Sequence, residues 1–217
     1  MNKIEIIHVG EPSYPTNCYL IYDEMKKGII IDPGFEASKI ISKIKEKNVT
    51  VEKIIFTHCH ADHICAVDDV KAYTGAKVYI HEEDLDGIDD TNKACFFHFP
   101  NENKPILSSK DVNVLKDNDV ITVGDINLKV IHTPGHTSGC ICLYEESMNV
   151  MFTGDTIFHN CYGRCDLPSS DIKKMGESLE KIFNNYSNII IYPGHEEKAN
   201  IDDIKKKIRL LYKIKNG

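Results

Sequence analysis

The chain has 217 residues, of which 41% are hydrophobic, and its 26 basic and 33 acidic residues give a net charge of −7. This length and composition suffice for a buried core, arranged as one large domain or two small ones. The acidic balance argues against broad nucleic-acid binding, which draws its affinity from lysine and arginine side chains set against phosphates, although a local basic patch stays open.

The first third of the sequence predicts short strands followed by a helix. Apolar runs separated by glycine, proline and charged turn residues predict strands at residues 4–9, 18–22 and 28–31. Apolar residues then recur at helical spacing between Ala37 and Ile44. A strand at residues 54–56, a helix at 65–73 and a strand at 76–80 are expected to follow.

Residues 88–106 show no clean periodicity, so we interpret them as a long loop. Loops of this length are uncommon unless they are functional or disordered. Phe96, Phe97 and Phe99 argue against disorder. We interpret these aromatic residues as a lid, as a subunit contact that leaves a homodimer open, or as packing onto the core.

The second half predicts a series of strands closed by two helices. Strands are expected at residues 112–115, 120–123, 126–132, 140–144 and 150–153, and one more at 188–192. Apolar residues at helical spacing predict amphipathic helices on either side of that last strand, over residues 172–183 and 201–211. Because strands and helices mix in both halves without a linker, we expect one α/β domain over residues 1–217.

The N-terminal segment MNKIEIIHVG lacks the apolar core and the small-residue cleavage site of a signal peptide. No apolar run approaches the length of a membrane span. We therefore expect a cytoplasmic protein that does not associate with membranes. Its eight cysteines are then expected to be reduced thiols rather than a secreted disulfide framework.

The most distinctive stretch is THCHADH, in which the six positions from His58 to His63 hold three histidines, one aspartate and one cysteine after an apolar run. Three later apolar runs also end in a metal-ligand residue beside a glycine turn: HTPGH contains His136, FTGD contains Asp155 and YPGH contains His195. Since α/β proteins form sites at the carboxyl ends of strands, we expect these four strand ends to converge at one edge.

The four strand ends supply seven candidate ligands, namely His58, His60, Asp62, His63, His136, Asp155 and His195. One tetrahedral zinc takes four ligands, so the set suits two metal ions with one bridging carboxylate. His58 and His60 are two apart and can point the same way from an extended segment. Asp62 and His63 lie past the turn and can face a second ion. Isolated histidines elsewhere, taken singly, are interpreted as ordinary polar residues.

Five motifs occur in the order IIIDPG, THCHADH, HTPGHTSG, FTGDTIF and YPGH, and together they resemble the metallo-β-lactamase-fold hydrolases. The resemblance implies an α/β chain folded as an αβ/βα four-layer sandwich of the metallo-β-lactamase type, with a two-metal site between its sheets. It also implies a role for each ligand. The first metal is expected on His58, His60 and His136 and the second on Asp62, His63 and His195, with Asp155 as the bridge and Asp32 as a supporting aspartate behind the ligands.

Within that family, the stretch GDTIFHNCYGRCDLPSSD most resembles the compact, single-domain glyoxalase II-like proteins, which are hydroxyacylglutathione hydrolase-like. It departs from their G-R-[ST]-D-x-P pattern by placing Cys165 in the Ser/Thr position. The two-domain glyoxalase II enzymes add a C-terminal helical domain that helps to hold glutathione. Only 22 residues follow His195, so we expect that domain to be missing and the selectivity for glutathione to be weak.

The site implied by the resemblance has a net positive charge, which favours an anionic substrate or a developing oxyanion. Zinc lowers the pKa of bound water to about 7 and so makes hydroxide available as the nucleophile. Asp62 is expected to have a catalytic role, by orienting this water, as well as to bind metal. A thiol has a pKa of roughly 8.5 and leaves without a strong general acid, and none is evident near the motifs.

We therefore expect a metal-dependent hydrolase, a thioesterase that cleaves a small thioester of the S-lactoyl-thiol type. Its cofactors are expected to be two divalent metal ions, zinc first, with iron or manganese as alternatives. Residues that follow Asp155 are candidates for contact with the substrate, namely Phe158, His159, Tyr162 and Arg164. For Arg164, a structural ion pair with Asp166 is an equal alternative.

Other functions stay open. An iron-dependent persulfide dioxygenase shares the fold and uses one iron, here on His58, His136 and Asp155, and sequence separates it poorly from a hydrolase because the remaining ligands persist in both. A lactonase or a β-lactamase is a second hydrolytic alternative. A diiron oxidoreductase is disfavoured, because such proteins carry glutamate where His60 stands. A non-catalytic metal-binding protein would keep the fold without needing all seven ligands.

Overall fold

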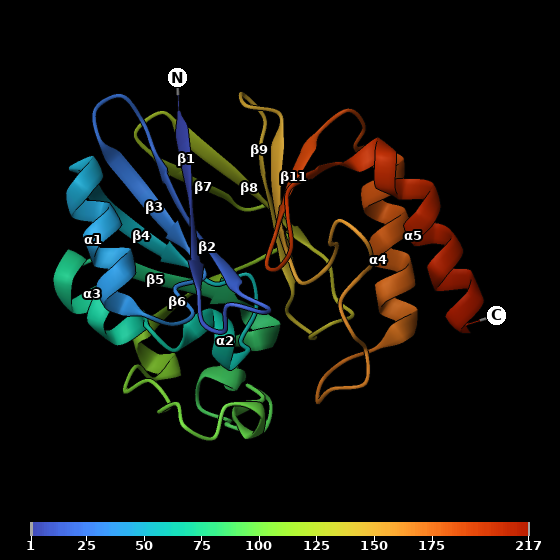
Figure 1. The fold of residues 1–217 in the computed structure, drawn as a ribbon, viewed down its shortest axis with the longest axis horizontal. Helices are drawn as coiled ribbons and strands as arrows, with labels where there is room; N and C mark the ends of the chain where they lie inside the picture. Colours follow the sequence, from blue (N-terminus) through green and yellow to red (C-terminus); the bar gives the residue numbers. More distant parts are fainter. Residues whose placement is uncertain (1, 217) are drawn as a thin grey trace.

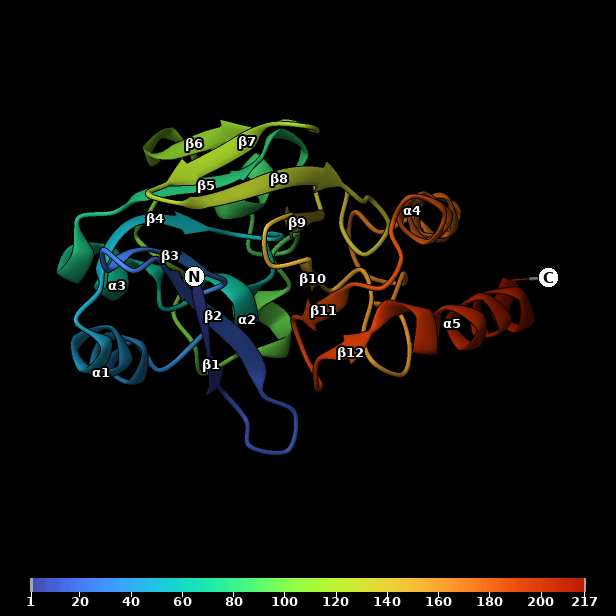
Figure 2. The same ribbon diagram turned by 90° about the horizontal axis from the view of Figure 1, so that it is seen from above.

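Two β-sheets stack face to face, and helices cover the outer face of each sheet, as Figure 1 shows. The computed structural model describes residues 2–216. Within this range the layers are, in order, helices α1 (Ala37–Lys47) and α3 (Val67–Thr74), the first sheet, the second sheet, and helices α4 (Ile172–Asn185) and α5 (Ile201–Asn216). The view from above places α1 and α3 on one side of the molecule and α4 and α5 on the other (Figure 2). The expected α/β four-layer sandwich is therefore confirmed.

The first sheet contains six strands that lie side by side in sequence order. The pairs β1–β2 and β2–β3 are antiparallel, whereas β3 to β6 run parallel to one another. The strands are β1 (Lys3–Val9), β2 (Thr16–Tyr22), β3 (Lys27–Ile31), β4 (Thr50–Ile55), β5 (Lys77–His81) and β6 (Val112–Leu115).

The second sheet also contains six strands, again in sequence order across the sheet. Its strands pair antiparallel except for β10 and β11, which are parallel. The strands are β7 (Val120–Val123), β8 (Ile126–His132), β9 (Ile141–Glu145), β10 (Val150–Gly154), β11 (Ile190–Pro193) and β12 (Ala199–Asn200).

Three hydrophobic clusters separate the four layers. Because successive side chains of a strand point to opposite faces, strand β3 contributes to two of these clusters. Ile29 and Ile31 lie in the core between the sheets, whereas Ile30 packs outward with Ile40 and Ile44 of α1. Burying such a side chain contributes roughly 1.5–3 kcal/mol, so strands that are apolar on both faces suit the middle layers.

Most predicted elements are present, with shifted boundaries. Strand β4 begins at Thr50, earlier than expected, and the helix expected over residues 65–73 is α3, which begins at Val67; the short helix α2 (Ala61–Ile64) before it was not expected. The segment 88–106, interpreted as a loop, contains one short 3-10 helix, η2 (Phe96–His98). It follows a longer one, η1 (Glu82–Ile88), and precedes η3 (Ser109–Asp111). The two-residue strand β12 carries no signal in the sequence.

Helix α2 and the segment that contains η1 and η2 lie at one end of the two sheets, at the lower edge in Figure 1. Strands β4, β8, β10 and β11 all end in loops that carry predicted ligands. The sandwich thus places the candidate site at this edge. Among residues 2–216, no helix combines the length and the apolar character needed to cross a bilayer.

Candidate metal centre

The four loops that follow β4, β8, β10 and β11 bring the seven candidate ligands together. Their ligand atoms form three overlapping groups, and the atoms of each group lie within 4.8 Å of one another. The groups are His58 with His60 and His136, His58 with His63 and Asp155, and Asp62 with His63 and His195. The convergence expected from the strand ends is therefore present in the structure.

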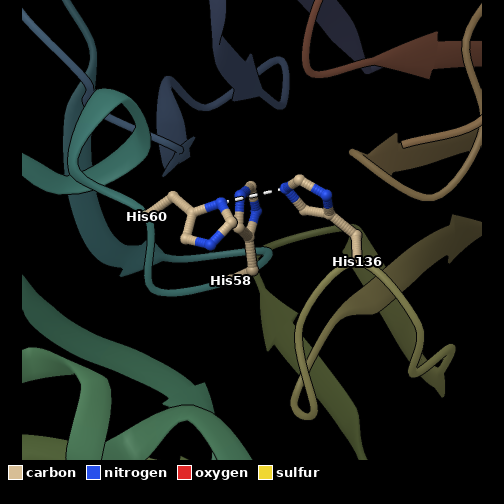
Figure 3. Close-up of side chains that lie close together, drawn as sticks. All are labelled: His58, His60 and His136. Carbon is tan, nitrogen blue, oxygen red and sulfur yellow. Dashed lines mark hydrogen bonds between the residues drawn. The ribbon is translucent and has the colours of Figure 1, made fainter. Parts of the chain in front are cut away.

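Three histidines form the first group, and Figure 3 shows their rings pointing toward one another. His60 Nδ1 lies 2.9 Å from His136 Nε2, a hydrogen-bonding distance. The ring centroids of His58 and His60 are 4.7 Å apart, and those of His58 and His136 are 5.0 Å apart. His58 and His60 come from the loop after β4 in the first sheet, whereas His136 comes from the loop after β8 in the second.

The second group consists of Asp62, His63 and His195. His195 Nε2 lies 3.2 Å from Asp62 Oδ2, and His63 Nε2 lies 3.6 Å from the same oxygen. Asp62 and His63 occupy the short helix α2, whose extended N-cap is His60. The turn from an extended loop into a helix therefore separates the ligands of one group from those of the other.

Asp155 lies between the two groups. Its Oδ1 is 3.4 Å from His63 Nε2, and its Oδ2 is 3.4 Å from His136 Nε2 and 3.7 Å from His195 Nε2. One carboxylate therefore faces histidines of both groups at once. This is the position that a bridging ligand of a two-metal site requires.

Four histidines of the centre have their Nδ1 atoms committed to residues outside the ligand set, whereas Nδ1 of His60 faces His136. His136 Nδ1 donates to the carbonyl of Arg164 at 2.8 Å, and His195 Nδ1 donates to the carbonyl of Pro15 at 3.0 Å. His63 Nδ1 lies 2.9 Å from Asp32 Oδ2, and His58 Nδ1 lies 3.1 Å from Thr57 Oγ1. Such contacts fix the ring orientation and the tautomer, and they leave Nε2 for a metal ion.

Buried polar atoms without a hydrogen-bond partner indicate whether these residues suit a metal ion. Among the residues that the structure describes, four buried side-chain atoms have no hydrogen-bond partner, and all belong to the centre: Nε2 of His58, His60 and His63, and Oδ1 of Asp155. Buried polar atoms in folded proteins are nearly always paired, so orphaned atoms need a partner such as an ion. Imidazole nitrogens and carboxylate oxygens are ligands that zinc and iron accept. The residues therefore fit divalent metal ions.

The pKa directions differ between the two groups. Burial and the surrounding histidines lower the pKa of His58, and they lower that of His60 to about 3. Burial acts in the same sense on His63, but the charges of Asp62, Asp155 and Asp32 outweigh it and raise the pKa of His63. His58 and His60 are thus neutral, whereas His63 holds a proton that a metal would displace.

The carboxylates of the centre remain ionised. Burial favours the neutral form of Asp62, but the charges of His63 and His195 dominate and lower its pKa to about 2. The same two histidines hold the pKa of Asp155 well below its usual value, against the effect of burial. Both carboxylates are therefore available as anionic ligands across the physiological pH range.

Glycines let the loops approach the ligands. A Cβ added to Gly194 would overlap Asp155 Oδ1 and lie 2.7 Å from His63 Cε1. A Cβ added to Gly34 would overlap the carbonyl oxygen of Asp62. These positions exclude any side chain, which explains the glycine turns of the IDPG and YPGH motifs in terms of space.

Two adjoining cavities open onto the centre, and Tyr14, Asp62 and His195 line both of them. The first has a volume of about 350 Å³, and its lining includes Phe158, Tyr162 and Arg164. The second, of about 510 Å³, lies against residues 10–16 and 98–102. His159, which was also expected to face substrate, is half-buried and lies outside the lining of the first cavity.

Arg164 makes the structural ion pair that the sequence left open. Its Nε and Nη2 donate to the two carboxylate oxygens of Asp166 at 2.7 and 2.9 Å. The side chain is about half exposed at the rim of the first cavity, while the carbonyl of the same residue orients His136. The backbone carbonyl of Arg164 thus orients a candidate ligand, and the guanidinium of its side chain pairs with Asp166.

The three phenylalanines of segment 88–106 lie in different environments. Phe96 is buried in the outer core of the first sheet, whereas Phe97 is 54% exposed. Phe99 packs on Phe35, with ring centroids 5.3 Å apart, and lines both cavities. Of these three aromatic residues, Phe99 alone lies beside the site and could cover it.

Sequence reasoning missed Tyr14. The loop between β1 and β2 places this ring on His195, with centroids 4.3 Å apart and an interplanar angle of 16°. Burial and nearby Asp155 raise the pKa of the Tyr14 hydroxyl, which keeps it protonated and able to donate a hydrogen bond. The only local signal is an aromatic residue between Pro12 and Pro15.

Comparison with known proteins agrees with this geometry. Residues 12–195 match the family model described as the metallo-beta-lactamase superfamily. The chain is 32% identical to the hydroxyacylglutathione hydrolase GloC of Haemophilus influenzae over 213 residues, which cover 94% of this chain and 95% of that protein.

Solved structures show the same similarity in three dimensions. The BLEG-1 B3 metallo-beta-lactamase superposes with a TM-score of 0.87 at 29% identity, covering 96% of this chain and 99% of that one. TTHA1623, solved in a di-iron-bound form, superposes with a TM-score of 0.84 at 26% identity, covering 95% and 99% of the two chains.

Proposed function

The chain belongs to the metallo-beta-lactamase superfamily, and we propose that it is a dinuclear metal-dependent hydrolase whose substrate is a small thioester of the S-lactoyl-thiol type. The observation that supports two ions is the position of Asp155, whose two oxygens face histidines of both ligand groups. The similarity to the hydroxyacylglutathione hydrolase GloC supports the choice of a thioester. We further propose that residues 1–217 act as one domain in the cytoplasm.

The distances between the ligand atoms divide the residues between two ions. His58, His60 and His136 would hold the first ion, and Asp62, His63 and His195 would hold the second, with Asp155 shared. When bound, divalent ions, zinc first among them, supply Lewis-acid chemistry: they make water acidic enough to act as hydroxide near neutral pH, and they polarise a carbonyl.

Side chains of this chain position the reactants. Asp62 is ionised and lines both cavities, so its carboxylate can accept a hydrogen bond from the attacking water and orient it. Tyr14 stands at the junction of the same cavities with a protonated hydroxyl, which suits donation to a carbonyl oxygen or a departing sulfur. A thiolate leaves readily because the pKa of a thiol is only roughly 8.5.

The two cavities provide a place for each arm of a thioester. They meet at Asp62 and His195, so a bond held there can extend one arm into about 350 Å³ and the other into about 510 Å³. Phe158 and Tyr162 line the first cavity, and Phe99 lines both. Apolar walls with a few polar groups are typical of small-molecule sites.

The test compares zinc-loaded and iron-loaded protein side by side. Each form is given S-lactoylglutathione and a smaller S-lactoyl thiol, with free thiol release as the readout, and glutathione persulfide, with oxygen uptake as the readout. We expect thioester cleavage without oxygen uptake. If only the iron form is active, consumes oxygen with the persulfide and leaves thioesters intact, the hydrolase proposal is wrong and a dioxygenase replaces it.

A further inference from the structure

We propose that Asp84, a residue of the 3-10 helix η1, is the positioning residue of the first ligand group. Its carboxylate joins the loop that carries His58 and His60 to the loop that carries His136, and it thereby sets how tightly this half of the centre holds its ion. The proposal rests on the proposed two-metal function. Asp84 acts on the ion through the two loops, and its role requires no contact with the substrate.

The contacts of Asp84 reach both loops. Its Oδ2 accepts hydrogen bonds from the backbone N–H of Cys59 at 3.1 Å and from the hydroxyl of Thr137 at 2.6 Å. Its Oδ1 accepts from the N–H of Gly139 at 2.7 Å and lies 3.4 Å from the hydroxyl of Ser138. Cys59 lies between two ligands of the first group, and Thr137 directly follows the third.

Burial makes these hydrogen bonds strong and hard to replace. The Asp84 side chain is 0% exposed, and the nearest cation, Lys93 Nζ, lies 3.8 Å from Oδ1. Water cannot substitute for a missing partner at such a site, and hydrogen bonds to a charged group are roughly twice as strong as neutral ones. The carboxylate therefore fixes its donors, and the donors belong to the ligand loops.

Close packing leaves η1 and the loops little freedom to move apart or together. A Cβ added to Gly139 would lie 2.5 Å from the backbone nitrogen of Asp84 and 2.6 Å from its Cβ. One turn further along η1, a Cβ added to Gly87 would overlap the sulfur of Cys59. Helix η1 is thus pressed against both loops, and Asp84 is the side chain that connects them.

The chemistry of the four contacts requires a carboxylate. Both oxygens of Asp84 accept, and each faces donors. An asparagine would present its NH₂ group either to Cys59 and Thr137 or to Ser138 and Gly139. In the first orientation the N–H of Cys59 would face a donor, and in the second the N–H of Gly139 would, so one backbone hydrogen bond to a ligand loop is lost in either case.

Asp84 and Asp32 contact different parts of the centre directly, although Asp32 also accepts from the N–H and the hydroxyl of Thr57, next to His58. Asp32 accepts from Nδ1 of His63, a ligand of the second group, at 2.9 Å. Asp84 instead anchors the two loops of the first group. We therefore expect Asp84→Asn to weaken the ion of the first group and Asp32→Asn to weaken chiefly the ion that His63 would hold, and this is a readout that loss of general stability would not produce.

The experiment measures zinc binding by Asp84→Asn and Thr137→Val, using competition with a chromophoric chelator to obtain the affinity for each of the two ions. Thr137→Val removes one hydrogen bond to Asp84 while keeping the side-chain volume. The matched control is Glu145→Gln. Glu145 is also buried and accepts hydrogen bonds from Ser147 and Met148, but these close the turn after β9. Thermal unfolding of chelator-treated protein gives the stability of every variant.

We expect Asp84→Asn to weaken the binding of one zinc ion by roughly 10–100-fold, the effect usual for residues that support metal ligands, and to leave the other ion unchanged. The affected ion should be the one weakened by His60→Ala and not the one weakened by His195→Ala. Thr137→Val should weaken the same ion to a smaller extent. Glu145→Gln should lower the unfolding temperature without changing either affinity.

Unchanged zinc affinities in Asp84→Asn and Thr137→Val, with stability losses like that of Glu145→Gln, would overturn the proposal. If Asp84→Asn does not fold, Thr137→Val decides. The N–H of Gly139 still holds the second loop in this variant, so a smaller loss is expected, and an unchanged affinity there would overturn the proposal. The assay uses no thioester. A protein that binds two zinc ions and cleaves no thioester therefore contradicts the proposed function alone.

Discussion

Nδ1 of His63 lies 2.9 Å from Oδ2 of Asp32, and both side chains are buried. The other oxygen of Asp32 accepts from the backbone N–H of Thr57, at the start of the ligand loop, at 2.7 Å. One carboxylate therefore orients a candidate ligand and also anchors the chain segment that leads to the others. The sequence implied this supporting role for Asp32 through resemblance alone, and the structure gives its contacts.

Replacing Asp32 with asparagine should weaken one zinc ion by roughly 10–100-fold, because an amide cannot accept from both Thr57 and His63. Asparagine tolerates the left-handed backbone at this position, where φ is 52°, so the substitution spares the turn. Chelator competition gives the affinities. Asp89→Asn, which removes an exposed carboxylate that binds Ser109, is the control. Equal affinities in Asp32→Asn and wild type would remove Asp32 from the centre.

Asp155→Ala should reduce the metal content below that of His195→Ala. Asp155 faces histidines of both groups, whereas His195 belongs to one. We expect fewer than one ion per chain in Asp155→Ala and about one in His195→Ala after dialysis, consistent with a bridging ligand. Elemental analysis of the dialysed variants measures this. Similar metal contents in the two variants would argue against a bridge.

The ion-free protein should lose stability as the pH falls from 6.5 toward 3. The unfolded chain protonates histidine near pH 6.5, whereas His60 stays neutral in the fold because its pKa is lowered to about 3. Protons thus favour the unfolded state throughout this window, by up to about 5 kcal/mol at its acid end. Urea unfolding of chelator-treated protein at several pH values measures the slope.

The variant His60→Gln should show a shallower fall over the same range, since glutamine does not titrate. His63 acts in the opposite sense, because its raised pKa contributes stability below pH 6.5 that is lost only as the pH rises. It therefore cannot produce the acid loss. A free energy of unfolding that is constant between pH 6.5 and 4 would contradict the burial of a neutral His60.

Gly194→Ala should impair metal binding, since its Cβ would overlap the shared carboxylate of Asp155 and press on His63. Gly75→Ala is the comparison. At Gly75 φ is +69°, but a Cβ meets no atom within 4 Å, so alanine there costs only roughly 1 kcal/mol of backbone strain. We expect weaker zinc binding in Gly194→Ala only. Normal affinities for both ions in this variant would show that the loop yields without disturbing Asp155.

Tyr14→Phe should lower kcat/KM for a thioester about tenfold or more, the usual effect of losing a hydrogen bond to a charged group, while leaving zinc binding intact. Phenylalanine keeps the stacking on His195 and removes only the hydroxyl. Tyr14→Ala removes both and should also alter KM. Full activity in Tyr14→Phe would limit the role of this residue to packing.

The sequence predicted those features of the centre that depend on local patterns. Each ligand follows an apolar strand and adjoins a turn, so the sequence pattern predicts that His136, Asp155 and His195 lie at strand ends. Tyr14 has no such pattern, since it reaches the centre only because β1 and β2 form a hairpin beside the loop of His195.

The role of Asp84 could not be predicted from the sequence for a different reason. It stands in the segment HEEDLDG among three other acidic residues, and nothing in that segment separates it from them. Only tertiary packing buries Asp84 while Asp86 stays exposed. The start of the helix expected over residues 65–73 has the same explanation: the N–H of Ala66 bonds to Pro33 and Gly34 in a distant turn, and α3 begins at Val67.

Each ligand group draws side chains from both sheets: His58 to His63 follow the first sheet, and His136, Asp155 and His195 follow the second. A bound ion would therefore be an intramolecular cross-link between the two halves of the sandwich. Its binding free energy adds to the free energy of separating them, so the unfolding temperature should depend on the free zinc concentration. Neither residues 1–115 nor residues 120–216 contain a complete group, and zinc affinity therefore reports the assembly of the two halves.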